Sequence, residues 1–410
     1  MSEAGPRQQD LVFPTHESEV SFKIPQGWNI SCCCPQKLPV LTDKEIRKCF
    51  ENPLGTQPLR NITHGKKSAA VVVEDISRPM RIDRILPVVL EELEAAGLEP
   101  ENIVIVSALG CHRPLSGPEF RRKLGNEIVN KYLTVNPSLY DNLKYMGDTP
   151  AGTPVWINAH VAKADIKIGL GGILPHPNAG FGGGGKTILP GVSGFETISK
   201  HHLNRMDVSK GIGEVENNPF RQDLEAAARL IGVDFVVNAI MGTDRDIVAL
   251  YAGDMIEAHR AAIENARRAY KVEAPPNADL VIINAFPEDY DLVQSTKALS
   301  RGMGIYSAKP KGRVLLFSSC PDGAGYHALF GPGGIGYEGF LERRKKQCEG
   351  YEVSIVSPGL GPVETHTVFP NTVPWFGSLA SAIENTEKVL PRGRVNIFPY
   401  GGISVLSGKI

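Results

Sequence analysis

The sequence lacks a strong charge of either sign, a long hydrophobic run and an amino-terminal export signal. The 44 Lys and Arg residues nearly balance the 45 Asp and Glu residues, so no strong electrostatic field points to nucleic acid or to an anionic membrane surface. No apolar stretch approaches the ~18 residues that indicate a membrane span. The first residues, MSEAGPRQQDLVFP, contain no basic segment followed by an apolar one. We therefore expect a cytoplasmic protein.

A disulfide framework is also missing. The seven cysteines are an odd number, and none of them forms a C-x-x-C pair. Such a set, spread along a long chain, is not typical of a disulfide-stabilised secreted domain. Three cysteines are consecutive, Cys32 to Cys34, but adjacent residues do not easily turn three thiolates onto one metal ion. We expect a structural or incidental role for them.

What the sequence does contain is an ordinary soluble composition, with 42% apolar and 22% charged residues in 410. A chain of this length exceeds the usual size of one hydrophobic core. Short runs rich in Val and Ile recur, as expected for strands covered on both faces. They are residues 68–74, 102–108, 164–170, 234–239, 278–286, 312–319, 351–357 and 394–399. Helical patterns lie between them, such as 82–97, so we predict an α/β protein with mainly parallel sheets.

The best domain boundary is a proline pair. A polar helix predicted over 254–272 is followed by EAPPNAD, and a new strand begins near Ala278. This divides a catalytic, cofactor-binding N-terminal domain, 1–273, from a smaller C-terminal α/β domain, 274–410, that contributes substrate contacts. We expect the active site to lie in a cleft between the two α/β domains.

Polar side chains follow four of the predicted strands at their carboxyl ends, where open parallel sheets collect ligands. In chain order they are Asp75, Arg78, His112 and His176 in the first domain and Gln294 and Lys297 in the second. A convergent set of this composition fits a site that handles protons and a small anion.

Most of these residues also have a structural interpretation. Asp75 is well placed to cap a helix that opens near Pro79. Arg78 also fits a surface ion pair, and the Gln/Lys pair fits an exposed helix face. The two histidines each stand beside proline in a glycine-bearing loop, a context that favours function. The histidines without such a context are expected to be structural: His16, His64, His160, His259, His327 and His366.

The run from Gly180 to Thr187 satisfies G-x-x-x-x-G-K-[ST], the phosphate-binding loop of nucleotide hydrolases. Glycine amides can hold a phosphate, and Lys186 adds a charge. That motif opens a long helix, however, whereas here Pro190 and Gly191 follow within two turns. We therefore favour a loop that brings backbone against a phosphorylated cofactor, beside a reactive lysine. The alternatives are a nucleotide hydrolase and a non-catalytic protein that binds a phosphorylated metabolite.

Two adjacent histidines, His201 and His202, follow shortly after Lys186. Neutral imidazole suits Zn, Cu, Fe and Ni, so a metal ligand is one interpretation of the pair and a surface accident is the other. The residues alone do not choose the metal.

Together these motifs resemble the nickel-dependent lactate racemase family of 2-hydroxyacid racemases and epimerases. The resemblance runs from ENPLGT (51–56) to the final strand. It is carried by DISRP, GCHRP, PHPNAGFGGGGKTILPG with its downstream histidine, and QSTK, in matching order and approximate spacing.

The resemblance implies a nickel pincer nucleotide, pyridinium-3,5-bisthiocarboxylic acid mononucleotide, attached covalently to Lys186. It also implies a histidine ligand to nickel, matched to His202 with His201 as the second choice, and activation by cofactor-biosynthesis proteins. The other cofactor contacts fall on the glycine loop, at Gly182, Gly183, Gly184, Gly185 and Thr187.

The implied activity inverts C2 of a 2-hydroxy acid by hydride transfer through a planar 2-keto acid, while two histidines handle the hydroxyl proton. The resemblance assigns the acid/base histidines to His112 and His176, the active-site Asp and Arg to Asp75 and Arg78, and the Gln/Lys pair to Gln294 and Lys297. An arginine suits the substrate carboxylate because its planar fork donates two hydrogen bonds. Departures from the lactate-using pattern, at Ser77, Met80, Val293 and 329–340, favour a longer hydroxy acid or a sugar acid.

Overall fold

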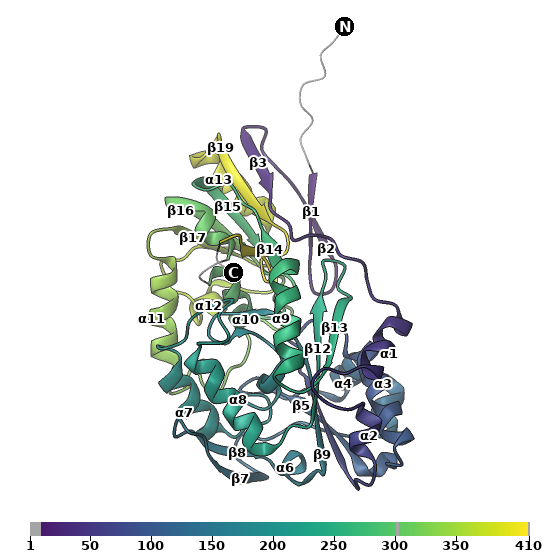
Figure 1. Cartoon of the computed structure of the whole chain (residues 1–410). Helices are drawn as coiled ribbons and strands as arrows, with labels where there is room; N and C mark the ends of the chain where they lie inside the picture. Colours follow the sequence, from purple (N-terminus) through teal and green to yellow (C-terminus); the bar gives the residue numbers. More distant parts are fainter. Residues whose placement is uncertain (1–9, 301–302, 409–410) are drawn as a thin grey trace. The chain divides into compact units, whose positions relative to one another are not determined.

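The computed structural model describes residues 10–300 and 303–408, which form two compact α/β units (Figure 1). One unit runs from Lys37 to Ala269, and the other combines residues up to Gln36 with those from Tyr270 onward. Within the described ranges, no helix is long and apolar enough to cross a membrane.

The Lys37–Ala269 unit is built on a six-stranded sheet with the order β13-β12-β9-β4-β5-β6. The strands are β4 (Ala69–Glu74), β5 (Ile103–Ala108), β6 (Leu133–Val135), β9 (Ile166–Gly172), β12 (Phe235–Met241) and β13 (Ile247–Gly253). All neighbours are parallel except β12 and β13. The chain adds β5 and β6 on one side of β4, and β9 and β12 on the other. The β4–β9 pair is therefore the switch point at which open sheets bind ligands.

Helices and short ribbons connect these strands. The helices are α1 (Asp43–Glu51), α2 (Leu59–Thr63), α3 (Ile82–Ala95), α4 (Gly117–Leu124), α5 (Asn126–Lys131), α6 (Ala159–Lys163), α7 (Phe195–Arg205), α8 (Pro219–Ile231) and α9 (Glu257–Tyr270). The antiparallel ribbons pair β7 (Leu143–Asp148) with β8 (Pro154–Asn158), and β10 (Pro175–His176) with β11 (Gly180–Phe181). Helix α3 lies within the predicted helical pattern 82–97, and Gly97 follows its end in the left-handed region at φ +99°.

The second unit has a parallel six-stranded sheet with the order β18-β17-β16-β15-β19-β3. Its strands are β3 (Trp28–Cys32), β15 (Ala278–Asn284), β16 (Ala308–Phe317), β17 (Glu352–Val356), β18 (Trp375–Phe376) and β19 (Gly393–Phe398). Its helices are α10 (Leu292–Ser295), α11 (Tyr337–Cys348), α12 (Pro362–His366) and α13 (Leu379–Val389). Two further pairs are β1 (Asp10–Pro14) with β2 (Glu19–Lys23), and β14 (Lys271–Val272) with β20 (Val405–Leu406).

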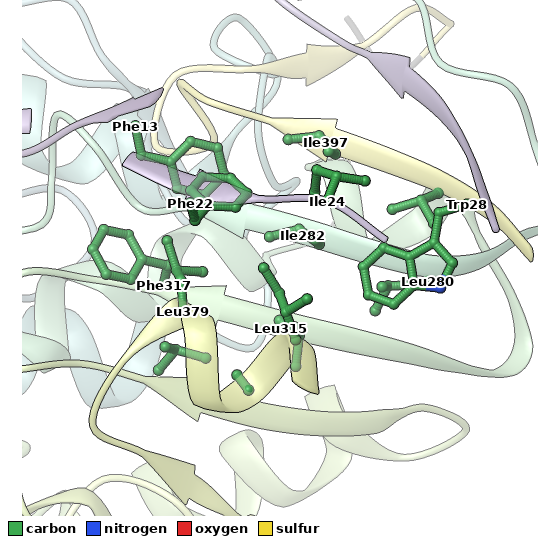
Figure 2. Close-up of a cluster of buried hydrophobic side chains, with 14 residues drawn as sticks. Phe13, Phe22, Ile24, Trp28, Leu280, Ile282, Leu315, Phe317, Leu379 and Ile397 are labelled. Atoms are coloured by element: carbon green, nitrogen blue, oxygen red, sulfur yellow. The ribbon is translucent and has the colours of Figure 1, made fainter. Parts of the chain in front are cut away.

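The amino-terminal segment completes the core of this second unit. Strand β3 pairs in parallel with β19 and forms one edge of the sheet. Figure 2 shows aromatic and aliphatic side chains of this segment packed on side chains of the later strands, and the buried cluster includes Phe13, Phe22, Trp28, Leu280 and Ile282. The division after residue 273 lies close to the Ala269–Tyr270 boundary, but residues up to Gln36 group with the later part of the chain.

The predicted fold class, α/β with mainly parallel sheets, is confirmed. Each of the eight predicted strands is present, and the largest shift is at β16, which begins at Ala308 instead of 312. The candidate residues of the two units can now be placed on loops that follow defined strands.

Candidate active site

The carboxylate of Asp75 orients the ring of His112. Asp75 follows β4 directly and is buried, and its Oδ2 lies 2.5 Å from Nδ1 of His112, in the loop after the adjacent β5. Its Oδ1 accepts hydrogen bonds from the backbone N and the hydroxyl of Ser77, at 2.8 and 2.6 Å. Burial raises the pKa of Asp75, but His112, Arg78 and Ser77 outweigh it and hold the pKa well below its usual range. Nδ1 of His112 therefore donates to an ionised carboxylate, which leaves Nε2 as the ring nitrogen able to accept a proton.

The capping interpretation of Asp75 is wrong. Helix α3 begins at Ile82, its N-cap is Arg81, and no side chain makes a capping hydrogen bond there. The contacts of Asp75 are those of a residue that orients a histidine.

The backbone around Arg78 is held by a buried lysine that the sequence analysis missed. Nζ of Lys123, on α4, donates to the backbone O of Arg78 at 2.7 Å and of Met80 at 3.1 Å. Burial lowers the pKa of Lys123, and the nearby carboxylates of Glu74 and Asp75 oppose that effect. No motif marks Lys123, which reads as one of three consecutive basic residues on a helix. Its ammonium fixes the loop from which Arg78 projects.

His176 lies beside the predicted tether. Its Nδ1 accepts hydrogen bonds from the backbone N of Asn178 and Ala179 at 3.2 and 3.0 Å, and its Nε2 lies 3.4 Å from Nζ of Lys186. Because Nδ1 acts as an acceptor, a neutral His176 carries its proton on Nε2, the nitrogen nearest the lysine. The structure therefore brings two predicted site residues together.

The glycine loop is fixed by a buried arginine and a buried histidine. The guanidinium of Arg221, on α8, donates to the backbone O of Phe181 and of Gly183, both at 3.2 Å. Nε2 of His259, on α9, lies 2.8 Å from the backbone O of Gly182. Three successive carbonyl groups are thus bound by side chains that sequence reasoning did not connect with this loop.

The charge of Arg221 is balanced inside this network. Oε1 of Glu225 accepts from Nε of Arg221 at 2.6 Å and from Nη1 of Arg260 at 2.8 Å. Burial, reinforced by the two arginines, holds the pKa of His259 well below its usual range. Its Nδ1 lies 2.9 Å from Nη1 of Arg260, and its Nε2 lies 2.8 Å from Nη2 of Arg221 as well as from O of Gly182. His259 is therefore structural, as predicted.

Several polar groups of the glycine loop bond within the fold. The N of Gly182 donates to O of Leu174 at 2.8 Å, and the N of Gly184 donates to Oδ1 of Asn238 at 2.9 Å. The hydroxyl of Thr187 donates to O of Gly184 at 3.0 Å. In this structure the amides of Gly182 and Gly184 therefore donate to acceptors within the protein. Close packing explains the glycine at 184, where a Cβ would lie 2.8 Å from Nη2 of Arg221.

The nucleotide-hydrolase alternative is contradicted by the local backbone. Lys186 lies in a four-residue 3-10 turn, Gly184–Thr187, and the next α-helix, α7, begins only at Phe195. The phosphate-binding loop of those enzymes instead opens directly into a long helix.

The two adjacent histidines on α7 differ in their hydrogen bonds. Nε2 of His201 lies 3.0 Å from O of Phe220, and Nδ1 of His202 lies 3.0 Å from O of Ile198. A carbonyl oxygen only accepts, so His201 is protonated at Nε2 and His202 at Nδ1. Burial lowers the pKa of His201 to about 4, which keeps it neutral. The lone pair of His202 is therefore on Nε2, the nitrogen suited to bind a metal.

Protein side chains alone do not assemble a metal cluster in the part of the chain that the structure describes, where no three His, Cys, Asp or Glu side chains converge suitably. A metal held by one histidine, with its other donors on an organic cofactor, needs no such cluster. The surface-accident interpretation of the histidine pair is wrong, since both side chains are buried.

Gln294 and Lys297 belong to the other unit and follow β15. Gln294 is buried on α10, and its backbone N donates to Oδ1 of Asp291 at 2.8 Å. Nζ of Lys297 lies 2.5 Å from Oε1 of the buried Glu288. The exposed-helix interpretation is therefore wrong for this pair, because one member is buried and the other forms an ion pair with a buried carboxylate.

Comparison with known proteins identifies the family. Residues 15–213 match the lactate racemase N-terminal domain. The chain is 30% identical over 331 residues to a lactate racemase of Thermoanaerobacterium thermosaccharolyticum, spanning 78% of this chain and 77% of that protein. It is 29% identical over 300 residues to a lactate racemase of Lactiplantibacillus plantarum, spanning 70% of each.

The fold is similar to two solved structures. The lactate racemase apoprotein from T. thermosaccharolyticum superposes with a TM-score of 0.78 at 24% identity, over 97% of this chain and 100% of that one. A protein from Thermotoga maritima gives a TM-score of 0.67 at 18% identity, over 91% and 100%. The structures confirm the fold, and the sequence relatives show that the chain belongs to the lactate racemase family and is an isomerase.

Proposed function

We propose that this protein inverts the C2 centre of a 2-hydroxy acid, with a nickel pincer nucleotide joined covalently to Lys186. The observation that carries the proposal is the placement of two histidines: His112 is paired with the ionised Asp75, and Nε2 of His176 lies 3.4 Å from Nζ of Lys186. The two relatives named lactate racemase support the same activity class.

The residues around Lys186 fit such a cofactor. Two buried polar atoms near the glycine loop have no hydrogen-bond partner: Nδ2 of Asn238, whose Oδ1 binds Gly184, and Oε2 of Glu74, whose Oε1 binds the N of Gly172. Buried polar atoms are normally satisfied, so both indicate a missing polar group. An amide donor suits a phosphate oxygen, and a carboxylate suits a ribose hydroxyl.

Lys186 is assigned as the covalent tether, and His202 as the nickel ligand through Nε2. When bound, the cofactor supplies a hydride acceptor, so that the C2 hydrogen leaves with its electron pair and the substrate becomes a planar 2-keto acid. The protein carries this group only after cofactor-biosynthesis proteins have supplied it.

The chain's own residues move the hydroxyl proton and hold the substrate. Nε2 of His112 takes the proton from the hydroxyl group, and Asp75 stabilises the imidazolium that forms. In the mirror-image orientation of the substrate, His176 is assigned to the same oxygen, to which its neutral ring donates a hydrogen bond from the N–H at Nε2. Arg78 holds the carboxylate with two parallel hydrogen bonds, and Gln294 and Lys297 are assigned supporting contacts to the substrate.

The substrate is proposed to be longer than lactate, either an extended 2-hydroxy acid or a sugar acid. The basis is Val293, next to Gln294, together with the departures at Ser77, Met80 and 329–340.

A chiral turnover assay tests the function. Protein produced together with the cofactor-building proteins is incubated with single enantiomers of 2-hydroxy acids, from lactate to sugar acids, each deuterated at C2. We expect at least one to be inverted with its deuterium retained, because the hydrogen moves as hydride. The proposal is overturned if nickel-loaded protein inverts none of them, or if the deuterium is lost to solvent.

A further inference from the structure

Cys32 and Cys34 lie side by side at the exposed end of an edge strand. Cys32 pairs with Ile397 in β19, and the backbone N of Cys33 donates to O of Ile397 at 2.7 Å, which keeps the chain extended here. Side chains two residues apart on an extended chain point to the same face. The Sγ atoms of Cys32 and Cys34 are accordingly 3.5 Å apart, and both residues are exposed.

The rest of the cysteines are in different surroundings. They are buried or half-buried, namely Cys33, Cys49, Cys111, Cys320 and Cys348. Burial raises the pKa of the thiols of Cys33 and Cys320 to about 12 and of Cys348 to about 11. A buried thiol with a raised pKa reacts slowly. Cys32 and Cys34, in contrast, are two neighbouring thiols that are both exposed to small molecules in solution.

A hydrogen bond divides the roles of the two exposed thiols. Donation by Cys34 lowers the pKa of Cys32 to about 7, against the opposing effect of burial, and the same hydrogen bond raises the pKa of Cys34. Cys32 is therefore the thiol of the pair that loses its proton more readily, and a thiol with a pKa near the ambient pH attacks disulfides most effectively.

We propose that Cys32 and Cys34 form a reversible dithiol–disulfide site that exchanges with low-molecular-weight disulfides. The thiolate of Cys32 attacks one sulfur of the small disulfide, forms a mixed disulfide and releases one thiolate. Cys34 loses its proton, attacks Sγ of Cys32 and releases the second thiolate, which leaves a Cys32–Cys34 bond. The dithiol loses two electrons and two protons, and the small disulfide is reduced to two thiols.

Closing the bond requires movement of both the side chains and the backbone. A disulfide has a sulfur–sulfur distance of about 2.05 Å, so the two Sγ atoms must approach by roughly 1.5 Å. Residues two apart on an extended chain lie about 6.6 Å apart at Cα, near the upper end of the disulfide range, so the backbone at Cys33 must also bend. The chain passes from one compact unit to the other at Gln36–Lys37, just beyond Cys34. A Cys32–Cys34 disulfide would therefore stiffen the segment just before the boundary between the two units.

Equilibration of the full chain with glutathione redox buffers tests the site. The protein is quenched in acid, its remaining thiols are alkylated, and its mass is measured before and after dithiothreitol. We expect the loss of two hydrogens in oxidising buffer, reversed by reductant. The Cys33→Ala variant must behave in the same way, because the bond joins the outer two cysteines.

Serine variants separate the two roles. Cys34→Ser should accumulate a glutathione adduct on Cys32 and should raise the pKa at which Cys32 is alkylated. Cys32→Ser should give neither adduct nor disulfide, and the half-buried Cys49→Ser is the control that matches wild type. Thermal melts confirm that each variant is folded. The proposal is contradicted if wild type keeps both thiols in oxidising buffer, or if oxidation is lost in Cys33→Ala.

Discussion

At the scale of single residues, the candidate site depends on hydrogen bonds that fix which nitrogen of each histidine carries the proton. Asp75 does this for His112, backbone amides do it for His176, and carbonyl groups do it for His201 and His202. In each case the partner atom of the ring decides whether the other nitrogen can donate, accept or bind a metal.

The role of Asp75 predicts a defined kinetic effect. Asp75→Asn keeps the shape of the side chain but removes the charge that, in the proposed mechanism, stabilises the His112 imidazolium. We expect kcat to fall by about 10²- to 10⁴-fold, with unchanged nickel content and unchanged mass of the Lys186 adduct. Steady-state kinetics on loaded protein measure this, and the exposed Asp83→Asn is the control. An unaltered kcat in Asp75→Asn would show that the carboxylate does not act through His112.

The buried His201 predicts how stability depends on pH. Its pKa is lowered to about 4 in the folded protein, whereas the unfolded chain takes up a proton near pH 6.5. The unfolded state binds more protons in this window, so stability is complete above pH 6.5 and falls toward pH 4. In His201→Gln the unfolding free energy should fall less over this pH range than in wild type, by up to about 3 kcal/mol. Denaturation curves between pH 7 and 4.5 provide the measurement, and equal slopes for both proteins would refute it.

At the scale of elements, the glycine loop is a packed structure whose carbonyl groups are bound by Arg221 and His259. A Cβ at Gly184 would lie 2.8 Å from Nη2 of Arg221, whereas a Cβ at Gly152 meets nothing within 4 Å. Both glycines have a left-handed backbone, at φ +56° and +78°, so the comparison isolates the packing effect.

We expect Gly152→Ala to cost about 1 kcal/mol of unfolding free energy, from backbone strain alone. Gly184→Ala should cost roughly 1–3 kcal/mol more and should reduce formation of the Lys186 adduct, because the loop must shift. Urea denaturation and intact mass give the two values. Equal costs for the two variants would mean that the Arg221 network does not constrain the loop.

Strands β4, β5, β9 and β15 could be predicted because strands buried on both faces appear as continuous apolar runs. The loops after them could be predicted as candidate sites because the carboxyl ends of parallel strands share one edge. The position of β3 could not, since Trp28–Cys32 is short and partly polar, and nothing local states which edge it joins. The contact of Arg221 with the glycine loop could not be predicted either, because a single arginine on an amphipathic helix is normally exposed to solvent.

At the scale of the whole molecule, the amino-terminal segment and the last 141 residues form one compact unit. Trp28 is buried in the shared core, and its Nε1 donates to O of Leu390 at 2.8 Å. Trp28→Ala should cost roughly 3–5 kcal/mol. Hydrogen exchange should increase in β15, β16 and β19 but not in β4, β5 and β9. Val12→Ala, at an exposed position, is the control. Faster exchange in both six-stranded sheets of Trp28→Ala would contradict the division of the chain into two units.

The most direct measurement on the proposed centre is the intact mass and nickel content of the protein from cells that build the cofactor. Wild type should carry the mass of the nucleotide adduct and nickel in proportion to it, as should Lys200→Ala, an exposed lysine on α7. Lys186→Ala should carry neither. The tether is contradicted if wild type has no adduct and no nickel while a known lactate racemase, produced in the same cells, has both.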